Sequence, residues 1–234
     1  MKRLLQPGGI IGFGLTSVFS VAQEWSLQEF CWSTWLAGLV FAWTCVVVAA
    51  IRILLTSRRQ VSRLEQKFAR RVRVRPGILQ AAVMLAAGLV AWLALYAYSF
   101  VFSFYGLFLS VFAEMEPVSL FGRNGFINSD FFTPVTYLVT KFWPMAVGTL
   151  AASAGEFVKG DPWKRILVPA EAEVLRMHLM ILALPVLSLL AWALFGSEYQ
   201  RVTIVLLCGL FFLLGARRKE EKKEDERGSG TGAA

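Results

Sequence analysis

The chain has 234 residues, of which 56% are hydrophobic and 17% charged, with a formal net charge of +8. The apolar residues are gathered into long blocks that are separated by clusters of charge. This pattern excludes an ordinary water-soluble globular domain, whose charged residues would cover its exterior. The composition therefore predicts an all-α, polytopic membrane protein.

The first two apolar blocks cover residues 8–22 and 30–55. The first is short and glycine-rich, and Gly8 and Gly12 favour close packing of a helix against a neighbour in lipid. The second is long enough to cross a membrane. Its Arg52 lies near the far end, where a long side chain can extend to the headgroups.

A strongly basic segment follows the second block and contains a single acid, Glu65. Apolar residues recur there at helical spacing, so we expect part of it to form an amphipathic helix on the membrane surface. Cations between two membrane helices favour contact with anionic lipid headgroups on the cytoplasmic side over a nucleic-acid site. The residues expected at the headgroups are Arg58, Arg59, Arg63, Lys67, Arg70, Arg71, Arg73 and Arg75.

The remaining apolar blocks complete six predicted crossings in one transmembrane domain over residues 1–216. The third block is longer than a bilayer is thick. Splitting it would make seven crossings and export the basic start of the tail, so we expect one bent or tilted helix. Both termini are then cytoplasmic, and residues 217–234 form a charged, disordered tail. The expected crossings are residues 8–22, 30–55, 78–113, 131–154, 177–195 and 202–216.

Lys141 stands in the middle of the fourth apolar block. A lysine at this depth costs about 2.5 to 3.5 kcal/mol on insertion scales. Pro144 follows three residues later and removes a backbone donor, which predicts a kink beside the charge. Lys141 could line a path for a substrate, a lipid headgroup or a proton. Alternatively it extends to the interface or pairs with one of three acids, which are Glu29, Glu114 and Glu116.

Other candidate residues favour packing over chemistry. Gly148, Ala152 and Gly155 repeat at small-residue spacing, which is typical of close helix contacts in lipid. His178 is the only histidine, and no CxxC pair accompanies it. One histidine does not supply the closed ligand set of a metal or haem site. We find no catalytic constellation and expect no metal or other cofactor.

Four short stretches carry a resemblance. They read Thr34-Trp35-Leu36-Ala37, Phe104-Tyr105-Gly106, Ser153-Ala154-Gly155 and Val174-Leu175-Arg176-Met177-His178. In order and spacing they resemble the motifs of an uncharacterised bacterial family of six-helix membrane proteins, a domain of unknown function. The family motifs are a Tyr-Trp-x-Glu-like turn, His-Tyr-Gly, Ser-His and Arg-x-x-x-Leu-His.

This chain resembles a divergent member of that family over most of residues 30–218. The resemblance implies a place in a bacterial plasma (inner) membrane. Ala37, Phe104 and Ala154 replace the family's acid and most of its histidines, and His178 remains. If those histidines bind a metal or haem in relatives, the resemblance implies that this chain lacks the site. That departure favours a structural or accessory role.

Two classes of function therefore remain open. One is a non-enzymatic structural or accessory subunit that packs against other membrane proteins, against itself or against lipid. The other is a small transporter or lipid-handling protein with Lys141 in its path. A membrane enzyme ranks third, because the sequence offers no set of residues for it.

Overall fold

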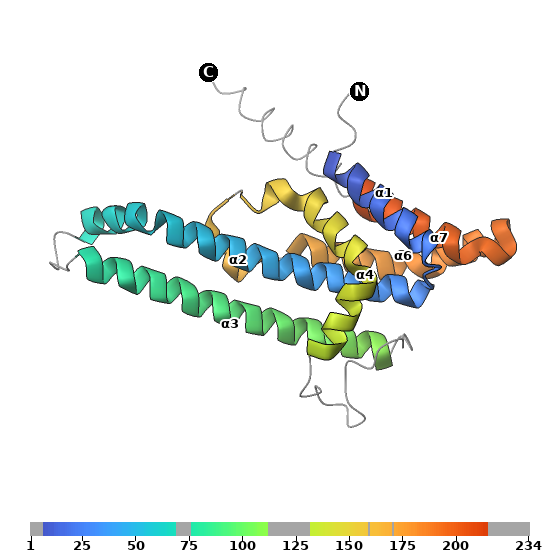
Figure 1. Ribbon diagram of the computed structural model, residues 1–234, viewed down its shortest axis with the longest axis horizontal. Coiled ribbons are helices and arrows are strands. Elements are labelled where there is room, and N and C mark those ends of the chain that lie inside the picture. The colour runs from blue at the N-terminus through green and yellow to red at the C-terminus, as the bar shows by residue number, and fades with distance from the viewer. Residues whose placement is uncertain (1–6, 69–75, 112–131, 159, 170, 215–234) are drawn as a thin grey trace, which may run out of the picture.

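The computed structural model describes residues 7–68, 76–111, 132–158, 160–169 and 171–214. Every regular element in these ranges is helical, which confirms the predicted all-α class there (Figure 1). The elements are α1 (Pro7–Ala22), α2 (Leu27–Phe68), α3 (Pro76–Val111), α4 (Phe132–Ser153), η1 (Ala154–Glu156), α5 (Pro162–Leu167), α6 (Glu171–Phe195), η2 (Gly196–Glu198), α7 (Tyr199–Gly209) and the π-helical turn η3 (Leu210–Leu214).

Three stretches among the described residues are long and apolar enough to cross a membrane, judged by length and composition: Leu27–Ser57, Gly77–Leu109 and His178–Leu213. The last of these includes η2, where Gly196 has a φ of 57° and the chain turns so that α7 packs against α6. α1 is apolar but shorter.

Neighbouring helices run antiparallel in the two main helix pairs. In α2 and α3, the Trp35 indole N–H donates to the Phe102 carbonyl over 2.9 Å, while Ser57 lies opposite Gln80 at the other end. In α1 and α4, the ring of Phe19 lies 5.1 Å from that of Trp143, near the opposite end from the contact between Gly8 and Ala151. Figure 1 shows α2 and α3 as the two longest helices, lying side by side.

α2 continues without interruption from the apolar block into the basic segment and ends at Phe68. We expected part of this segment to be helical, and residues 56–68 are helical as the continuation of α2. Their contact with the membrane surface stays a prediction. α2 continues here because no glycine or proline occurs between Leu55 and Pro76 to stop the helix. Pro76 then opens α3, a position where its missing N–H costs nothing.

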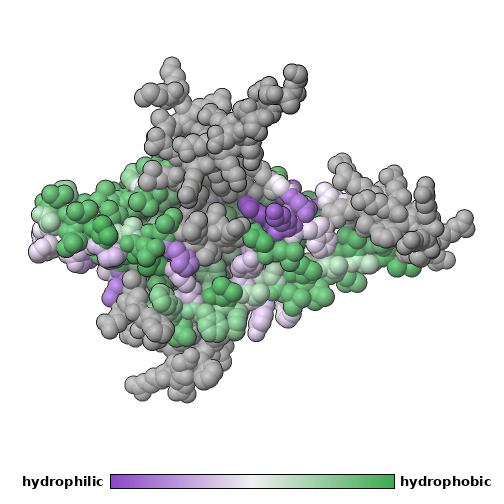
Figure 2. Space-filling view, turned by 180° about the vertical axis from the view of Figure 1, so that it is seen from behind, coloured by the Kyte–Doolittle hydropathy of each residue, from purple (hydrophilic) through white to green (hydrophobic). Residues whose placement is uncertain are grey.

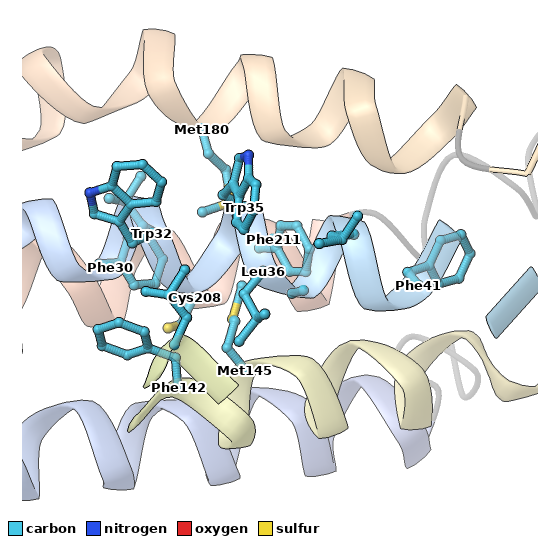
Figure 3. Close-up of a cluster of buried hydrophobic side chains, with 14 of the residues drawn as sticks. Phe30, Trp32, Trp35, Leu36, Phe41, Phe142, Met145, Met180, Cys208 and Phe211 are labelled. Atoms are coloured by element: carbon cyan, nitrogen blue, oxygen red, sulfur yellow. The ribbon is translucent and has the colours of Figure 1, made fainter. Parts of the chain in front are cut away.

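The core is aromatic and centred on the first half of α2 (Figure 3). Trp32, Trp35 and Leu36 are fully buried, and Phe142 of α4 and Phe211 of η3 lie against the same cluster. The Trp32 and Trp35 rings meet edge to face, the preferred geometry of aromatic pairs, with 5.8 Å between their centroids. α2 is thus the helix around which the others pack.

The outer surface of the described residues is largely hydrophobic on the face that Figure 2 shows. Large apolar side chains on α3 and α6 are more than half exposed, among them Leu85, Leu89, Leu182 and Leu194. Such a surface suits contact with lipid or with other membrane helices.

The loop predicted between residues 155 and 176 contains a short helix, α5, that the sequence did not predict. Asp161 caps it, Pro162 opens it, and Ile166 is fully buried between α2 and α3. Arg52 holds the preceding loop by donating to the carbonyls of Phe157 (3.4 Å) and Gly160 (3.1 Å).

Candidate functional site

Glu29 caps the beginning of α2. The Ser26 N–H donates to Glu29 Oε2 over 2.9 Å, and the Glu29 N–H donates to Ser26 Oγ over 3.2 Å. This reciprocal pair is a capping box, which satisfies two backbone donors that the first turn of a helix leaves free. It also fixes the position of the Glu29 carboxylate, because one of its oxygens is held by the backbone.

Lys141 of α4 donates to the other oxygen of the same carboxylate, Glu29 Oε1. The lysine side chain is 34% exposed and the glutamate side chain 17% exposed. Of the three acids that the sequence offered as partners, the structure brings Glu29 to Lys141. Glu114 and Glu116 lie outside the described residues. A single carboxylate therefore joins the start of α2 to the middle of α4.

The predicted kink in α4 is present and lies next to the ion pair. Phe142 leaves the helical conformation, with a φ of −113° and a ψ of 17°, two residues before Pro144. Its ring lies 5.6 Å from Lys141 Nζ and meets the Trp25 ring edge to face at 5.0 Å. The kink thus places one buried aromatic ring between the charge and the core.

Small residues on α4 form the contact with α1. A Cβ added to Gly148 would lie 3.0 Å from the Gly12 Cα, and one added to Gly12 would lie 2.8 Å from the Gly148 carbonyl oxygen. Ala152 continues this contact, with its Cα against Gly8. Gly155 is exposed in η1, beyond the end of α4.

A second charged cluster joins two turns and was not predicted from the sequence. Arg201 at the start of α7 donates to Glu24 over 2.7 Å and to Glu198 over 3.0 Å. Glu24 lies in the connection from α1 to α2, so the cluster ties that connection to the turn between α6 and α7. All three side chains are about half exposed or more.

His178 lies on the outer side of α6, and its ring packs on Tyr105 of α3 with 5.2 Å between the centroids. Two motifs of the family resemblance therefore meet here. Within the described residues, no three side chains of histidine, cysteine, aspartate or glutamate gather as a metal site would require. The absence of a cofactor stays a prediction.

The expected headgroup-contacting cations, Arg58 to Arg75, have side chains outside the described part of the structure. The backbone of those up to Lys67 belongs to the last turns of α2. Their contact with lipid also stays a prediction.

Comparisons with protein families, with curated proteins and with solved structures found no match. The resemblance to a six-helix family stays a prediction.

Proposed function

We propose that this chain is a non-enzymatic structural or accessory protein of the bacterial inner membrane. In this proposal six helices cross the bilayer, namely α1, α2, α3, α4, α6 and α7, with both termini in the cytoplasm. Its outer surface packs against other membrane proteins or lipid. The antiparallel contacts of α1 with α4 and of α2 with α3 support this alternating path.

The observation that carries the proposal is the partner of Lys141. A charge inside a bundle that binds a transported molecule needs a free face, whereas Lys141 is paired with an acid that also caps a helix. Because both carboxylate oxygens of Glu29 are hydrogen-bonded, we infer that the ion pair holds α2 and α4 together. The pair is only partly buried, so we expect it to fix how α2 and α4 meet more than to add stability.

The basic segment supports the cytoplasmic placement of the α2–α3 connection. Eight cations accompany one acid between residues 56 and 77, and such clusters stay on the cytoplasmic side. Anionic headgroups attract them by about 1 kcal/mol per cation near the surface.

The alternative is a small transporter or lipid-handling protein with Lys141 in its path. One observation favours it, because the Lys141 side chain keeps a third of its surface exposed beside a break in α4. An anion could then displace Glu29 and bind the lysine.

Three variants separate the two functions: Lys141→Met, Glu29→Gln and the double variant. Glutamine can keep the capping box, so the test isolates the ion pair. Each single change strands one charge, and we expect it to lower the free energy of unfolding by about 1 to 3 kcal/mol. The double variant strands none and should recover to within about 1 kcal/mol, measured by thermal unfolding in detergent.

For a structural protein, the double variant also restores the phenotype of a host that lacks the gene. A well-folded double variant whose host keeps the full deletion phenotype would contradict the structural role and favour the transporter. Native-gel purification with mass spectrometry identifies the neighbours in either case.

The topology has its own test, in reporter fusions after Phe68, Asp130 and Arg218. We expect cytoplasmic, external and cytoplasmic signals in that order. An external signal after Arg218 would overturn the six-crossing path.

A further inference from the structure

The outer face of α3 carries a row of aromatic residues at every fourth position, here called the α3 ridge: Trp92, Tyr96, Phe100, Phe104 and Phe108. All five side chains are between 45% and 66% exposed. The first two rings stack, with 6.2 Å between their centroids and 17° between their planes. Phe100 and Phe104 meet edge to face at 4.7 Å. Residues four apart form the ridges by which helices pack into one another's grooves.

The polar side chains on the inner face of α3 are hydrogen-bonded. The Tyr98 hydroxyl donates to the Leu167 carbonyl over 2.9 Å, and Ser99 Oγ donates to the Leu95 carbonyl over 2.7 Å. Ser99 also accepts from the Trp43 indole N–H over 3.1 Å. Tyr98 and Ser99 on the inner face of α3 therefore both have hydrogen-bond partners in α2, α3 or the α5 segment.

The α3 ridge differs, because the described residues give neither the Trp92 N–H nor the Tyr96 hydroxyl a hydrogen bond. Both lie near the middle of the Gly77–Leu109 stretch. The hydrogen bond between Trp43 of α2 and Ser99 of α3 shows that this part of α3 lies beside the centre of the Leu27–Ser57 stretch. Tryptophan and tyrosine usually keep their polar ends at the headgroups. At the centre of a bilayer, lipid tails offer no hydrogen-bond acceptor.

We propose that the α3 ridge is the contact between two copies of this chain, related by a two-fold axis along the membrane normal. The two α3 helices then run parallel, and each residue near the axis meets its own counterpart. A tyrosine hydroxyl both donates and accepts, so the Tyr96 hydroxyl of one copy can donate to the Tyr96 hydroxyl of the other and form one hydrogen bond. A different helix would need an acceptor of its own at this depth.

The neighbouring row on α3 supplies the groove. Leu89, Leu93 and Ala97 follow one another at the same spacing and are exposed beside the ridge. Ala97 is the small member, next to Tyr96, and leaves room for a ring from the second copy. The inference rests on the proposed membrane placement, and it names a second copy as the partner.

The test uses cysteine cross-linking in membranes, because Cys31, Cys45 and Cys208 are all buried and should give little background. Leu93→Cys places a thiol beside the proposed axis and leaves Tyr96 intact. Leu182→Cys, on α6 and 71% exposed, is the matched control on another face. With an added oxidant, two thiols lose their protons and two electrons to form a disulfide. We expect a product of twice the chain mass for Leu93→Cys and none above background for Leu182→Cys.

Adding Tyr96→Phe to the Leu93→Cys variant removes the hydroxyl and keeps the ring. We expect dimer affinity in liposomes to fall about 3- to 15-fold, the range of one hydrogen bond between membrane helices. The folding temperature of the dilute protein should not change. Single-molecule photobleaching in liposomes counts the copies independently.

Three outcomes overturn the proposal. These are equal cross-linking at both cysteines, one bleaching step per particle at every density, or a Leu93→Cys product whose mass matches another protein. None of them bears on the Lys141 and Glu29 variants. If the protein is a monomer and the double variant Lys141→Met, Glu29→Gln still restores the host, the dimer proposal is wrong and the structural role is unaffected.

Discussion

α2 and α3 are adjacent, long and almost equally apolar, yet the rest of the chain treats them differently. In the most apolar stretch of each helix, 44% of the α2 residues are buried, against 17% of the α3 residues. α2 contacts α3, α4, α5, α6 and α7, whereas α3 packs mainly against α2 with a smaller contact to α5. One helix is the centre of the bundle, and the other forms its wall.

This difference shows that apolar character alone does not decide burial in a membrane protein. In water, a helix that is apolar all round must be buried, but lipid covers such a helix equally well. α2 differs in its contacts. Its indole and hydroxyl groups form hydrogen bonds with neighbouring helices or with its own backbone, and its aromatic rings pack against one another. The outer face of α3 has none of these bonds among the described residues.

The largest expected effect comes from removing a ring at the centre of α2. Trp35→Ala deletes a fully buried indole and removes its hydrogen bond to the Phe102 carbonyl. We expect a loss of about 3 to 5 kcal/mol in the free energy of unfolding. Trp92→Ala, which is 63% exposed on α3, should change it by less than about 1 kcal/mol in dilute detergent. Equal losses, measured by thermal unfolding, would erase the distinction between the two helices.

Glycine substitutions test the same contrast at the backbone. Gly12→Ala forces a methyl group to 2.8 Å from the Gly148 carbonyl, so α1 must move away from α4. We expect a loss of about 1 to 3 kcal/mol, the usual cost of overpacking. Gly88→Ala on α3 meets nothing within 4 Å and should stabilise its helix by about 0.5 to 1 kcal/mol. A neutral Gly12→Ala variant would show that the close contact of α1 and α4 is not required.

Two tyrosines on α3 give a finer test, because they lie two residues apart on different faces. Tyr98→Phe removes the hydroxyl that donates to the Leu167 carbonyl, and we expect a loss of about 1 kcal/mol with faster hydrogen exchange in α5. Tyr96→Phe should leave the stability of the dilute protein unchanged. Protected α5 amides in the Tyr98→Phe variant would contradict a role for this bond in holding α5.

The smallest effect is expected at the exposed charges. Arg201→Gln breaks the contacts with Glu24 and Glu198, and exposed pairs contribute at most about 1 kcal/mol. Thermal unfolding at low and high salt should therefore differ little between this variant and the parent. A loss comparable to that of Trp35→Ala would mean that the turn cluster stabilises the bundle as a whole.

The apolar blocks of the sequence predicted where the helices lie. The blocks at residues 8–22 and 78–113 correspond closely to α1 and α3, because each is framed by charge, glycine or proline. Part of the basic segment is helical, as predicted, but it continues α2 up to Phe68, since nothing in the sequence stops α2 at Leu55. α5 was missed because six residues are too few to show a periodic pattern.

The site was harder to predict than the helices. The kink at Pro144 follows from local chemistry and needs no neighbour. Which acid pairs with Lys141 depends on how α2 and α4 meet, and three acids suited the sequence equally well. The Ser26-x-x-Glu29 capping pattern was visible, and it would have fixed the position of one of them. The contact of Arg201 with Glu24 gave no local signal, because the two residues are 177 positions apart.

The shared carboxylate of Glu29 also has a consequence for synthesis. Lys141 follows Glu29 by 112 residues, so a ribosome that adds about 5 to 20 residues per second delivers the lysine roughly 6 to 22 s later. During that interval the Glu29 carboxylate has no Lys141 to pair with, and we expect the first turn of α2 to stay in contact with water at the membrane surface. Arrested chains that end before and after Lys141 emerges should differ in the labelling of a cysteine placed at Ser26. Equal labelling at both lengths would mean that α2 reaches its final depth before α4 exists.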